Sequence, residues 1–298
     1  MSMHELQFLR LLDRARAFAG EGRPLHAAQL YRRMIADEPR LIAPSVELAS
    51  LYEEIGLPRA AVETLLRAAK AVPGDEDLVF LIGTAYLGCD EVKLALRWFR
   101  KLAGRKLPEV HFNMGLAHCR RDDFAAAEVE FRLARECAPH FPHINEYLGE
   151  LLIKREAYTE AIETLRRGVA ADPYSALSHH LLGVALGKLR RWYKAYRSFV
   201  TAVDLDPGEP AFWQMCAESL LELKRYQEAE AYLRKSLELS PSSVDTLVDL
   251  GHLLLRRGEE DRGKEYIVRA LSIDRAQARE REARWTASTR GQTRHQSS

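Results

Sequence analysis

Cysteine is scarce in this sequence, and the four cysteines present are scattered along it. Cys89, Cys119, Cys137 and Cys216 form no CxxC pair. A disulfide framework or a cysteine-rich zinc site requires cysteines in closely spaced sets. Neither is therefore expected, and a reduced, cytoplasmic setting suits the chain best.

The sequence also lacks an excess of charge of either sign and any long apolar run. It holds 44 Lys and Arg against 43 Asp and Glu, so its formal net charge is +1. A balanced charge gives no electrostatic basis for binding nucleic acid or an anionic membrane surface. No stretch approaches the roughly 18 apolar residues of a membrane-spanning helix, and the N-terminus does not resemble a signal peptide. We expect no membrane insertion.

The common catalytic and nucleotide-binding motifs are missing as well. The sequence contains no GxxxxGK[ST], GxGxxG, HExxH or GxSxG. His111 and His118 lie on one expected helix, but no Cys/His cluster at ligand spacing accompanies them, so a buried structural role is favoured. We therefore predict no catalytic residues, no bound metal and no cofactor, and a protein that is not an enzyme.

What the sequence does contain is a repeat with a period of 34 residues. Two series of small residues share this period and one common irregularity, a step of 32: Ala27, Ala61, Ala95, Ala127, Ala161, Ala195, Ala229 and Gly263, and Ala15, Ala49, Gly83, Gly115, Gly149, Gly183, Ala217 and Gly251. Closing prolines such as Pro173 and Pro207 follow the same period. The pattern predicts about eight repeats over residues 8–275, starting near 8, 42, 76, 108, 142, 176, 210 and 244.

Each repeat is predicted to form two helices. Apolar residues recur at helical spacing on both sides of a short break, as at Leu182 and Leu186 before it and Phe199 and Val203 after it. The small residues are expected where the two helices cross, and a larger side chain in each repeat, such as Phe99, fills the space around them. One helical pair cannot bury its own apolar face, so stacked pairs should form an all-α solenoid.

These residues resemble the tetratricopeptide repeat (TPR) family. The small residue of the first helix, the Tyr or Leu three positions later, the Ala of the second helix, the aromatic residue four positions on and the closing Pro all match its pattern. The resemblance implies an α-solenoid with a right-handed superhelix. Residues 1–7 are then an N-terminal lead-in, 276–287 a capping helix anchored by Trp285, and 288–298 a disordered polar tail.

The resemblance also implies a concave groove that is lined by the first helices and binds a partner protein. Positions 2, 5, 6, 9 and 12 of the repeats supply the candidate residues Phe80, Leu81, Thr84, Phe112, Asn113, Leu116, His143, Glu146, Tyr147, Glu150, His180, Val184, Gln214 and Glu218. They form an apolar trough with a polar rim, which suits an extended or helical segment of a partner. For the rings at position 5, groove contact and packing between helices are equally open.

The groove residues do not match the family's clamp for chaperone C-termini. That clamp requires Lys and Asn at positions 5 and 9 of one repeat, and no repeat here has both. We predict a non-catalytic scaffold or adaptor. A dedicated chaperone or assembly factor for a secreted or complex-forming client, and a self-assembling scaffold, are the alternatives. Whether the C-terminal tail fills the groove is left open.

Overall fold

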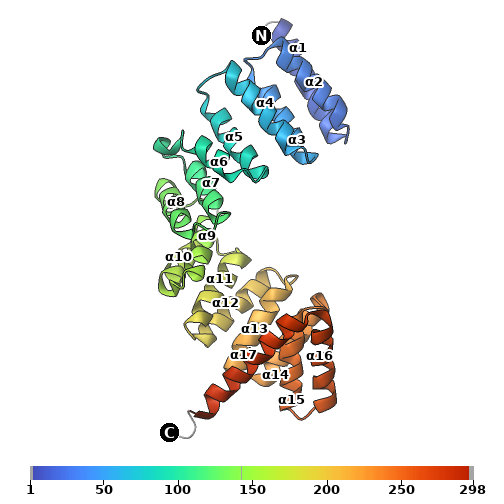
Figure 1. Ribbon diagram of the computed structural model, residues 1–298, viewed down its shortest axis with the longest axis vertical. Helices are drawn as coiled ribbons and strands as arrows, with labels where there is room; N and C mark the ends of the chain where they lie inside the picture. The colour runs from blue at the N-terminus through green and yellow to red at the C-terminus, as the bar shows by residue number, and fades with distance from the viewer. Residues whose placement is uncertain (1–2, 142, 295–298) are drawn as a thin grey trace. The chain divides into compact units, whose positions relative to one another are not determined.

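The computed structural model is a succession of packed helices (Figure 1). It describes residues 3–141 and 143–294, and these residues form α-helices and one short 3₁₀-helix, with no strand among them. The predicted all-α repeat fold is therefore confirmed. The chain divides into two compact units, Met1–Ile144 and Asn145–Ser298.

The first unit contains helices α1 to α8, and each helix packs against its neighbours in sequence. Its first helices are α1 (Met3–Gly20), α3 (Ile42–Glu54), α5 (Glu76–Gly88) and α7 (Pro108–Cys119). Its second helices are α2 (Pro24–Asp37), α4 (Pro58–Ala71), α6 (Val92–Phe99) and α8 (Phe124–Cys137).

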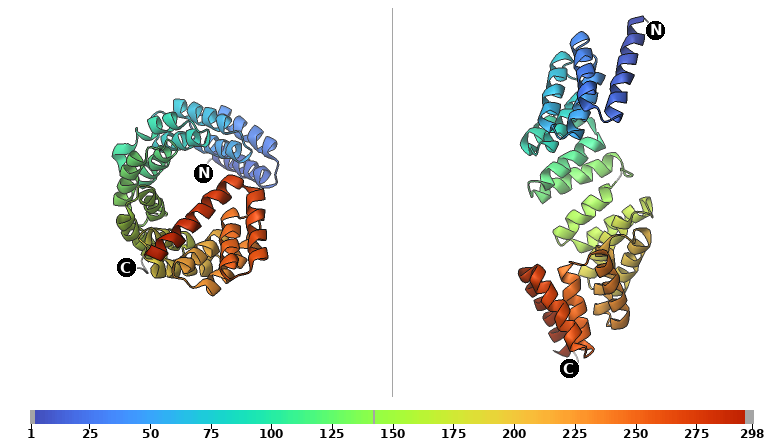
Figure 2. Two further views of the ribbon diagram at one scale, coloured as in Figure 1. Left: turned by 60° about the horizontal axis from the view of Figure 1, so that its bottom comes forward. Right: turned by 90° about the vertical axis from the view of Figure 1, so that its right-hand side faces the viewer.

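The second unit has the same alternation and one further helix. Its first helices are α9 (Ile144–Lys154), α11 (Ala176–Lys188), α13 (Pro210–Glu222) and α15 (Val244–Arg256). Its second helices are α10 (Tyr158–Ala171), α12 (Trp192–Leu205), α14 (Tyr226–Leu239) and α16 (Glu260–Ile273). The last helix, α17 (Arg275–Arg294), lies against both α15 and α16 and is drawn in red in Figure 2.

The C-terminal end of the chain is more helical than the sequence suggested. At the other end, residues 3–7 of the expected lead-in belong to α1, which begins at Met3. The capping helix does not end at residue 287, because α17 continues to Arg294 and includes residues 288–294 of the expected tail. No proline interrupts this segment, and its Ala, Arg, Glu and Gln residues favour helix. The remaining predicted tail, 295–298, lies outside the described residues.

The two-residue shortening of one repeat falls at the end of its second helix. Helix α6 has 8 residues, whereas α4 and α8 on either side have 14 each. A 3₁₀-helix, η1 (Ala103–Arg105), follows, and Lys106 then takes a left-handed conformation with φ 55°. The shorter connection therefore replaces the last turns of the second helix and leaves the first helices intact.

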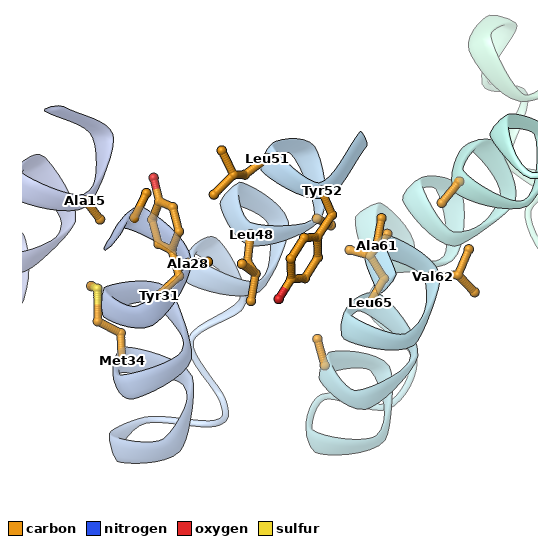
Figure 3. Close-up of a cluster of buried hydrophobic side chains, with 14 of the residues drawn as sticks. Ala15, Ala28, Tyr31, Met34, Leu48, Leu51, Tyr52, Ala61, Val62 and Leu65 are labelled. Carbon is orange, nitrogen blue, oxygen red and sulfur yellow. The ribbon is translucent and has the colours of Figure 1, made fainter. Parts of the chain in front are cut away.

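The small residue of each first helix lies beneath a large side chain of the second helix. Three repeats pair glycine with phenylalanine: Gly83 with Phe99, Gly115 with Phe131 and Gly183 with Phe199. An added Cβ on Gly183 would lie 2.6 Å from Cε1 of Phe199, closer than side chains pack. Other repeats have alanine in the first helix, as Ala49 in the repeat of Leu65 and Ala15 in that of Tyr31, whereas Gly149 opposite Leu165 is again a glycine without room for a Cβ. Figure 3 shows Ala15, Tyr31 and Leu65 in the core of the first unit. Glycine is therefore needed wherever the facing side chain lies directly against the first helix.

The turn inside each helix pair places one residue in the left-handed region. These residues are Gly22, Gly56, Asp90, Asp122, Glu156, Arg190, Lys224 and Gly258, with φ between 56° and 83°. The next N–H then bonds back to the first helix, as Arg191 N does to the Leu186 carbonyl at 3.0 Å. Five of the eight turns use a residue with a Cβ, which costs about 1–2 kcal/mol in this conformation.

Replacement of Arg190 by glycine should therefore stabilise the protein. Relief of the Cβ strain is partly offset by the greater freedom of glycine in the unfolded chain, so we expect a gain of about 0.5–1 kcal/mol. Urea denaturation of the full chain measures it. The neighbouring variant Arg191→Gly is the control, because Arg191 has φ −86° and gains nothing from glycine. Unchanged or reduced stability of Arg190→Gly would contradict the strain argument.

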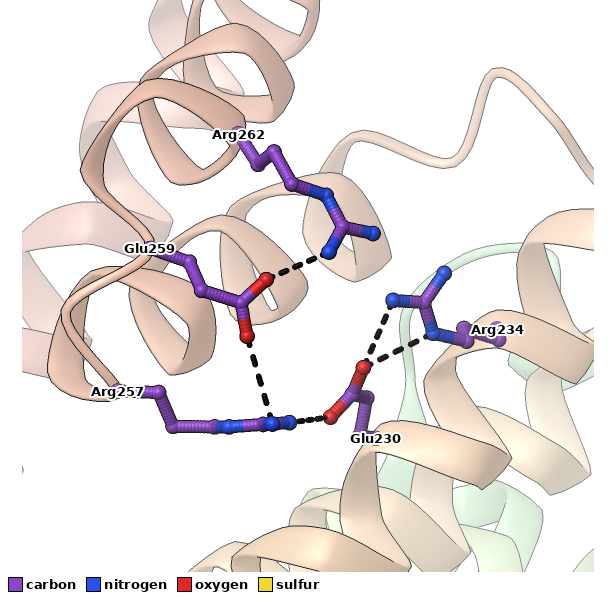
Figure 4. A network of polar contacts seen from close by, with 5 residues as sticks. All are labelled: Glu230, Arg234, Arg257, Glu259 and Arg262. Carbon is purple, nitrogen blue, oxygen red and sulfur yellow. Dashed lines mark hydrogen bonds and ion pairs between the residues drawn. The ribbon is translucent and has the colours of Figure 1, made fainter.

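A surface charge network connects α14 to the turn between α15 and α16 (Figure 4). Glu230 accepts a hydrogen bond of 2.7 Å from Nη2 of Arg234 and also forms an ion pair with Arg257. Glu259 then links Arg257 at 3.4 Å to Arg262 at 2.5 Å. Exposed pairs of this kind contribute at most about 1 kcal/mol each. The network therefore orients the last helix pair more than it stabilises it.

None of the described helices is both long and apolar enough to cross a membrane.

Candidate partner-binding surfaces

The first helices of successive pairs contact one another directly, α3 with α5 and α5 with α7 in the first unit, and α11 with α13 in the second. We call this side of each unit its first-helix face, and it corresponds to the predicted groove. Residues Phe80, Leu81, Thr84, Phe112, Asn113, Leu116 and His143 belong to the first unit; Glu146, Tyr147, Glu150, His180, Val184, Gln214 and Glu218 belong to the second.

The rings at position 5 pack against the second helix of their own repeat. Ring centroids are 5.9 Å apart for Phe80 and Phe99, 5.8 Å for Phe112 and Phe131, and 5.6 Å for His180 and Phe199. All three position-5 rings are half-buried. They therefore contribute to packing while keeping part of their surface on the first-helix face.

Two of these rings are enclosed further by a second aromatic contact. Phe112 also meets Phe141 at 5.3 Å, and His180 meets Phe212 at 4.9 Å. Burial lowers the pKa of His180, although the nearby Glu209 carboxylate raises it. The main role of Phe112 and His180 is therefore to pack neighbouring helices together.

Glu146 does not belong to a polar rim, because its side chain is buried with 6% of its surface exposed. The hydroxyls of Ser175 and Ser178 each donate a hydrogen bond of 2.8 Å to its Oε1. These bonds join the start of α9 to the start of α11. Sequence position alone put Glu146 on the groove, and the approach of the next helix pair covers it.

The other polar candidates differ in how they are held. Thr84 and Asn113 donate to carbonyls of their own helices, Leu81 at 2.9 Å and Glu109 at 2.8 Å. Glu150 is exposed and pairs with Lys154 at 2.9 Å. The remaining candidates are exposed (Tyr147, His143) or half-buried (Leu116, Val184, Gln214).

A pocket of about 410 Å³ lies on the first-helix face of the first unit, between α3 and α5. It is lined by Ile42, Ala43, Val46, Glu47, Asp77, Phe80 and Leu81. Two of the predicted residues, Phe80 and Leu81, thus share one depression. The α3 residues were not among those predicted from the sequence, although Val46 and Glu47 occupy positions 5 and 6 of their repeat, as Phe80 and Leu81 do in theirs.

The edge of this pocket carries negative charge. Asp77 is exposed, and none of the ion pairs of the described residues includes it. Glu47 is held from the other side by Arg16, whose Nε donates to Oε1 at 2.9 Å. The pocket therefore combines an apolar floor with one exposed carboxylate and one that is already neutralised.

On the second unit, α17 covers part of the first-helix face. Arg281 donates from Nε to Oδ1 of Asp249 at 2.9 Å and from Nη2 to Oδ2 at 2.6 Å, and Nη2 lies 3.4 Å from Oε2 of Glu218. Burial raises the pKa of Asp249 to about 6, while the hydrogen bonds from Arg281 lower it. The candidate Glu218 thus contacts the protein's own C-terminal helix.

A second contact is made by aromatic stacking. Trp285 stacks on His252 of α15, with ring centroids 5.4 Å apart and planes at 15°. Beside α17 a pocket of about 360 Å³ remains, lined by Lys188, Glu218, Leu221, Glu222, Tyr226, Asp249, Arg256, Arg281, Arg284 and Trp285. Asp249, His252 and Arg281 were not among the residues predicted from the sequence. The sequence features that could have identified them are an acidic residue at position 6 and a histidine at position 9 of the last repeat, and an arginine four residues before Trp285.

The histidines in the described part of the chain do not gather with other potential metal ligands. Among the described residues, no group of three or more His, Cys, Asp and Glu side chains could hold a metal ion. His111 is buried, and its Nδ1 lies 2.8 Å from Oε2 of Glu130. This contact gives it a place in the packing between α7 and α8.

Three family models match the chain. Two tetratricopeptide repeat models match residues 112–176 and 220–281, and the model of anaphase-promoting complex subunit 3 matches residues 154–236. Relatives include tetratricopeptide repeat protein 16 of Mus musculus, 24% identical over 50% of this chain, and trd-1 of Caenorhabditis elegans, 22% identical over 84%. The chain spans 21% and 31% of the lengths of these two relatives.

Solved structures share the fold. MamA from Desulfovibrio magneticus RS-1 is 27% identical, has a TM-score of 0.54 and covers 57% of this chain and 98% of its own. PilF of Pseudomonas aeruginosa has a TM-score of 0.60 at 17% identity over 70% of this chain and 97% of its own. Repeats of this kind are generally non-catalytic modules for protein interaction. The 34-residue period, the paired helices and these matches together show that the chain belongs to the tetratricopeptide repeat family.

Proposed function

We propose that this protein is a non-catalytic scaffold that binds an extended or helical segment of a partner protein on the first-helix face of its first unit. The pocket between α3 and α5 is the observation that carries the proposal. Its floor is formed by the half-buried side chains of Val46, Phe80 and Leu81. Such depressions receive the apolar anchor residues that dominate binding of peptide segments.

The lining of the pocket indicates the chemistry of the segment. A volume of about 410 Å³ accommodates one or two large apolar side chains. The exposed carboxylate of Asp77 at the edge favours a Lys or Arg next to that anchor, because complementary charge improves both association rate and specificity. We therefore propose a partner segment with an aromatic or aliphatic anchor followed by a basic residue.

A second role uses the same face. A relative, the type IV pilus assembly protein PilF of Pseudomonas aeruginosa, is 24% identical over 63% of this chain. By that similarity the protein would shield a segment of an assembling client and release it afterwards. The two roles differ in lifetime: a scaffold retains its partner in the finished complex, whereas an assembly factor does not.

The variant Leu81→Lys tests the binding face. A cation in the apolar floor should weaken binding of the partner by about tenfold or more, equal to about 1.4 kcal/mol. Tagged full-length wild type and variant are used to purify partners from the native host, and the affinity of a recovered partner is then measured by calorimetry. The purification also shows whether that partner stays in a stable complex.

The matched control is Val129→Lys, the same change at an exposed site on α8, where 56% of the valine surface is accessible. It should bind as wild type does. Thermal unfolding should show that both variants remain folded. Equal recovery of every partner by wild type and Leu81→Lys would remove the first-unit face as the binding site.

A further inference from the structure

Helix α17 is placed differently from the helices that begin each repeat. Within the preceding pair, a first helix such as α13 packs mainly against the second helix, α12, and only slightly against the first helix, α11. Helix α17 packs against the first helix α15 as well as against α16, and its larger contact is with α15 (Figure 2). It therefore extends over the first-helix face of the second unit, where a TPR unit receives its ligands.

The contacts of α17 lie along one side of the helix and are largely polar. Ala278, Arg281, Glu282 and Trp285 follow one another at spacings of three, one and three residues, which places them on one helical face. Ala278 is fully buried, Arg281 meets Asp249, and Glu282 lies 3.9 Å from Nε2 of His252. A small alanine supplies the fully buried apolar contact of this face.

Such an interface fixes the position of α17 on α15 but contributes little binding free energy. Taking a guanidinium and a carboxylate out of water costs about as much as their attraction returns. The Arg281 side chain is 11% exposed and that of Asp249 is 1% exposed, so this cost applies in full. Helix α17 can consequently leave the face at a modest cost in free energy.

The surface beneath α17 specifies what can replace it. Glu218 and Asp249 both approach the Arg281 guanidinium, and removal of Arg281 would leave two neighbouring carboxylates without it. The His252 ring offers a flat surface on which Trp285 now stacks. An occupant of this face therefore needs a guanidinium and an aromatic ring at the separation of one helical turn.

We propose that α17 is an internal ligand of the second unit, and that a helical partner segment with an arginine and an aromatic residue four positions apart displaces it and binds Asp249 and His252. This surface is separate from the first-unit pocket, and neither proposal depends on the other. Helix α17 then keeps the second unit closed to weaker ligands and opens it to a segment that reproduces its own contacts.

A peptide of this chain's own residues 275–294, labelled with a fluorophore, is the probe. Its binding to the full-length protein is measured by fluorescence anisotropy. Wild type should bind it weakly, because α17 competes from within the same chain. The double variant Arg281→Ala/Trp285→Ala, whose own helix is weakened, should bind it at least about tenfold more tightly. A peptide that carries Arg281→Ala should not show this increase in affinity for the double variant.

Two further variants make the test specific. Arg279→Ala is the matched control, because Arg279 is exposed on α17, and it should bind the peptide as wild type does. Asp249→Asn added to the double variant should weaken peptide binding by about tenfold, because the bond to a neutral amide is weaker. Leu81→Lys should leave peptide binding unchanged, which separates this proposal from the first-unit pocket.

Circular dichroism shows whether the double variant is folded. If it is not, Trp285→Ala alone replaces it, with an expected gain in affinity for the peptide of about threefold.

Two results would overturn the proposal. Equal weak binding by wild type and variant, while trypsin cleaves α17 faster in the variant, would make α17 a structural cap. Concentration-dependent dimerisation of wild type through exchanged α17 would make a second copy the occupant instead of another protein.

Discussion

The variant Gly83→Ala is expected to lower the stability of the first unit by about 1–3 kcal/mol, although alanine favours an α-helix over glycine by about 1 kcal/mol. The reason is the crossing of α5 and α6. A Cβ on Gly83 would lie 2.7 Å from Cδ1 of Phe99 and closer still to Cε1, and Phe99 is fully buried. Chemical denaturation of the full chain measures the change.

A second substitution should restore much of that loss. The chain itself pairs alanine with leucine in Ala49 and Leu65, so Gly83→Ala/Phe99→Leu imitates an arrangement that the protein already uses. We expect the double variant to be more stable than Gly83→Ala alone. Gly88→Ala on the same helix is the control. Nothing lies within 4 Å of the Cβ it would add, so its stability should be unchanged or higher by up to about 1 kcal/mol. Destabilisation by both alanine variants would point to the glycine backbone instead of the crossing.

Glu146→Ala is expected to destabilise the second unit by about 2–4 kcal/mol. The substitution leaves the hydroxyls of the buried Ser178 and the half-buried Ser175 without the carboxylate that accepts their hydrogen bonds. Denaturation of the full chain, followed by circular dichroism, measures the loss. Glu146→Gln keeps an accepting oxygen and should cost less than about 1 kcal/mol.

The comparison with Glu150→Ala separates a packing role from a binding role. Glu150 lies one helical turn later on α9, is exposed and pairs with Lys154, so its removal should change stability by less than about 0.5 kcal/mol. Both residues were predicted to line the groove. If Glu146→Ala unfolds like wild type, the buried hydrogen bonds contribute nothing measurable and its assignment to packing fails.

The position-5 residues show how much of the candidate site could be predicted from the sequence. The repeat register places Phe80, Phe112 and His180 on the first helix at equivalent sites, and this placement needs no coordinates. Whether such a ring faces a ligand or a neighbour depends on the second helix and on the loop that follows. Phe141 encloses Phe112 in this way, whereas Phe80 lines an open pocket. These contacts join residues that no fixed spacing relates, so the sequence pattern could not distinguish the two.

Sequence alone determined the repeat, because each 34-residue unit carries its own small residues, helix breaks and apolar periodicity, and these are local properties. It also predicted which helices form the first-helix face. Only the tertiary structure showed that Glu146 is covered and that Arg281 reaches Asp249, 32 residues away. Burial and ion pairing depend on which helices pack together. The packing of α17 against α15 could not be predicted from the sequence, because a polar helix has no apolar stripe from which its packing partner can be inferred.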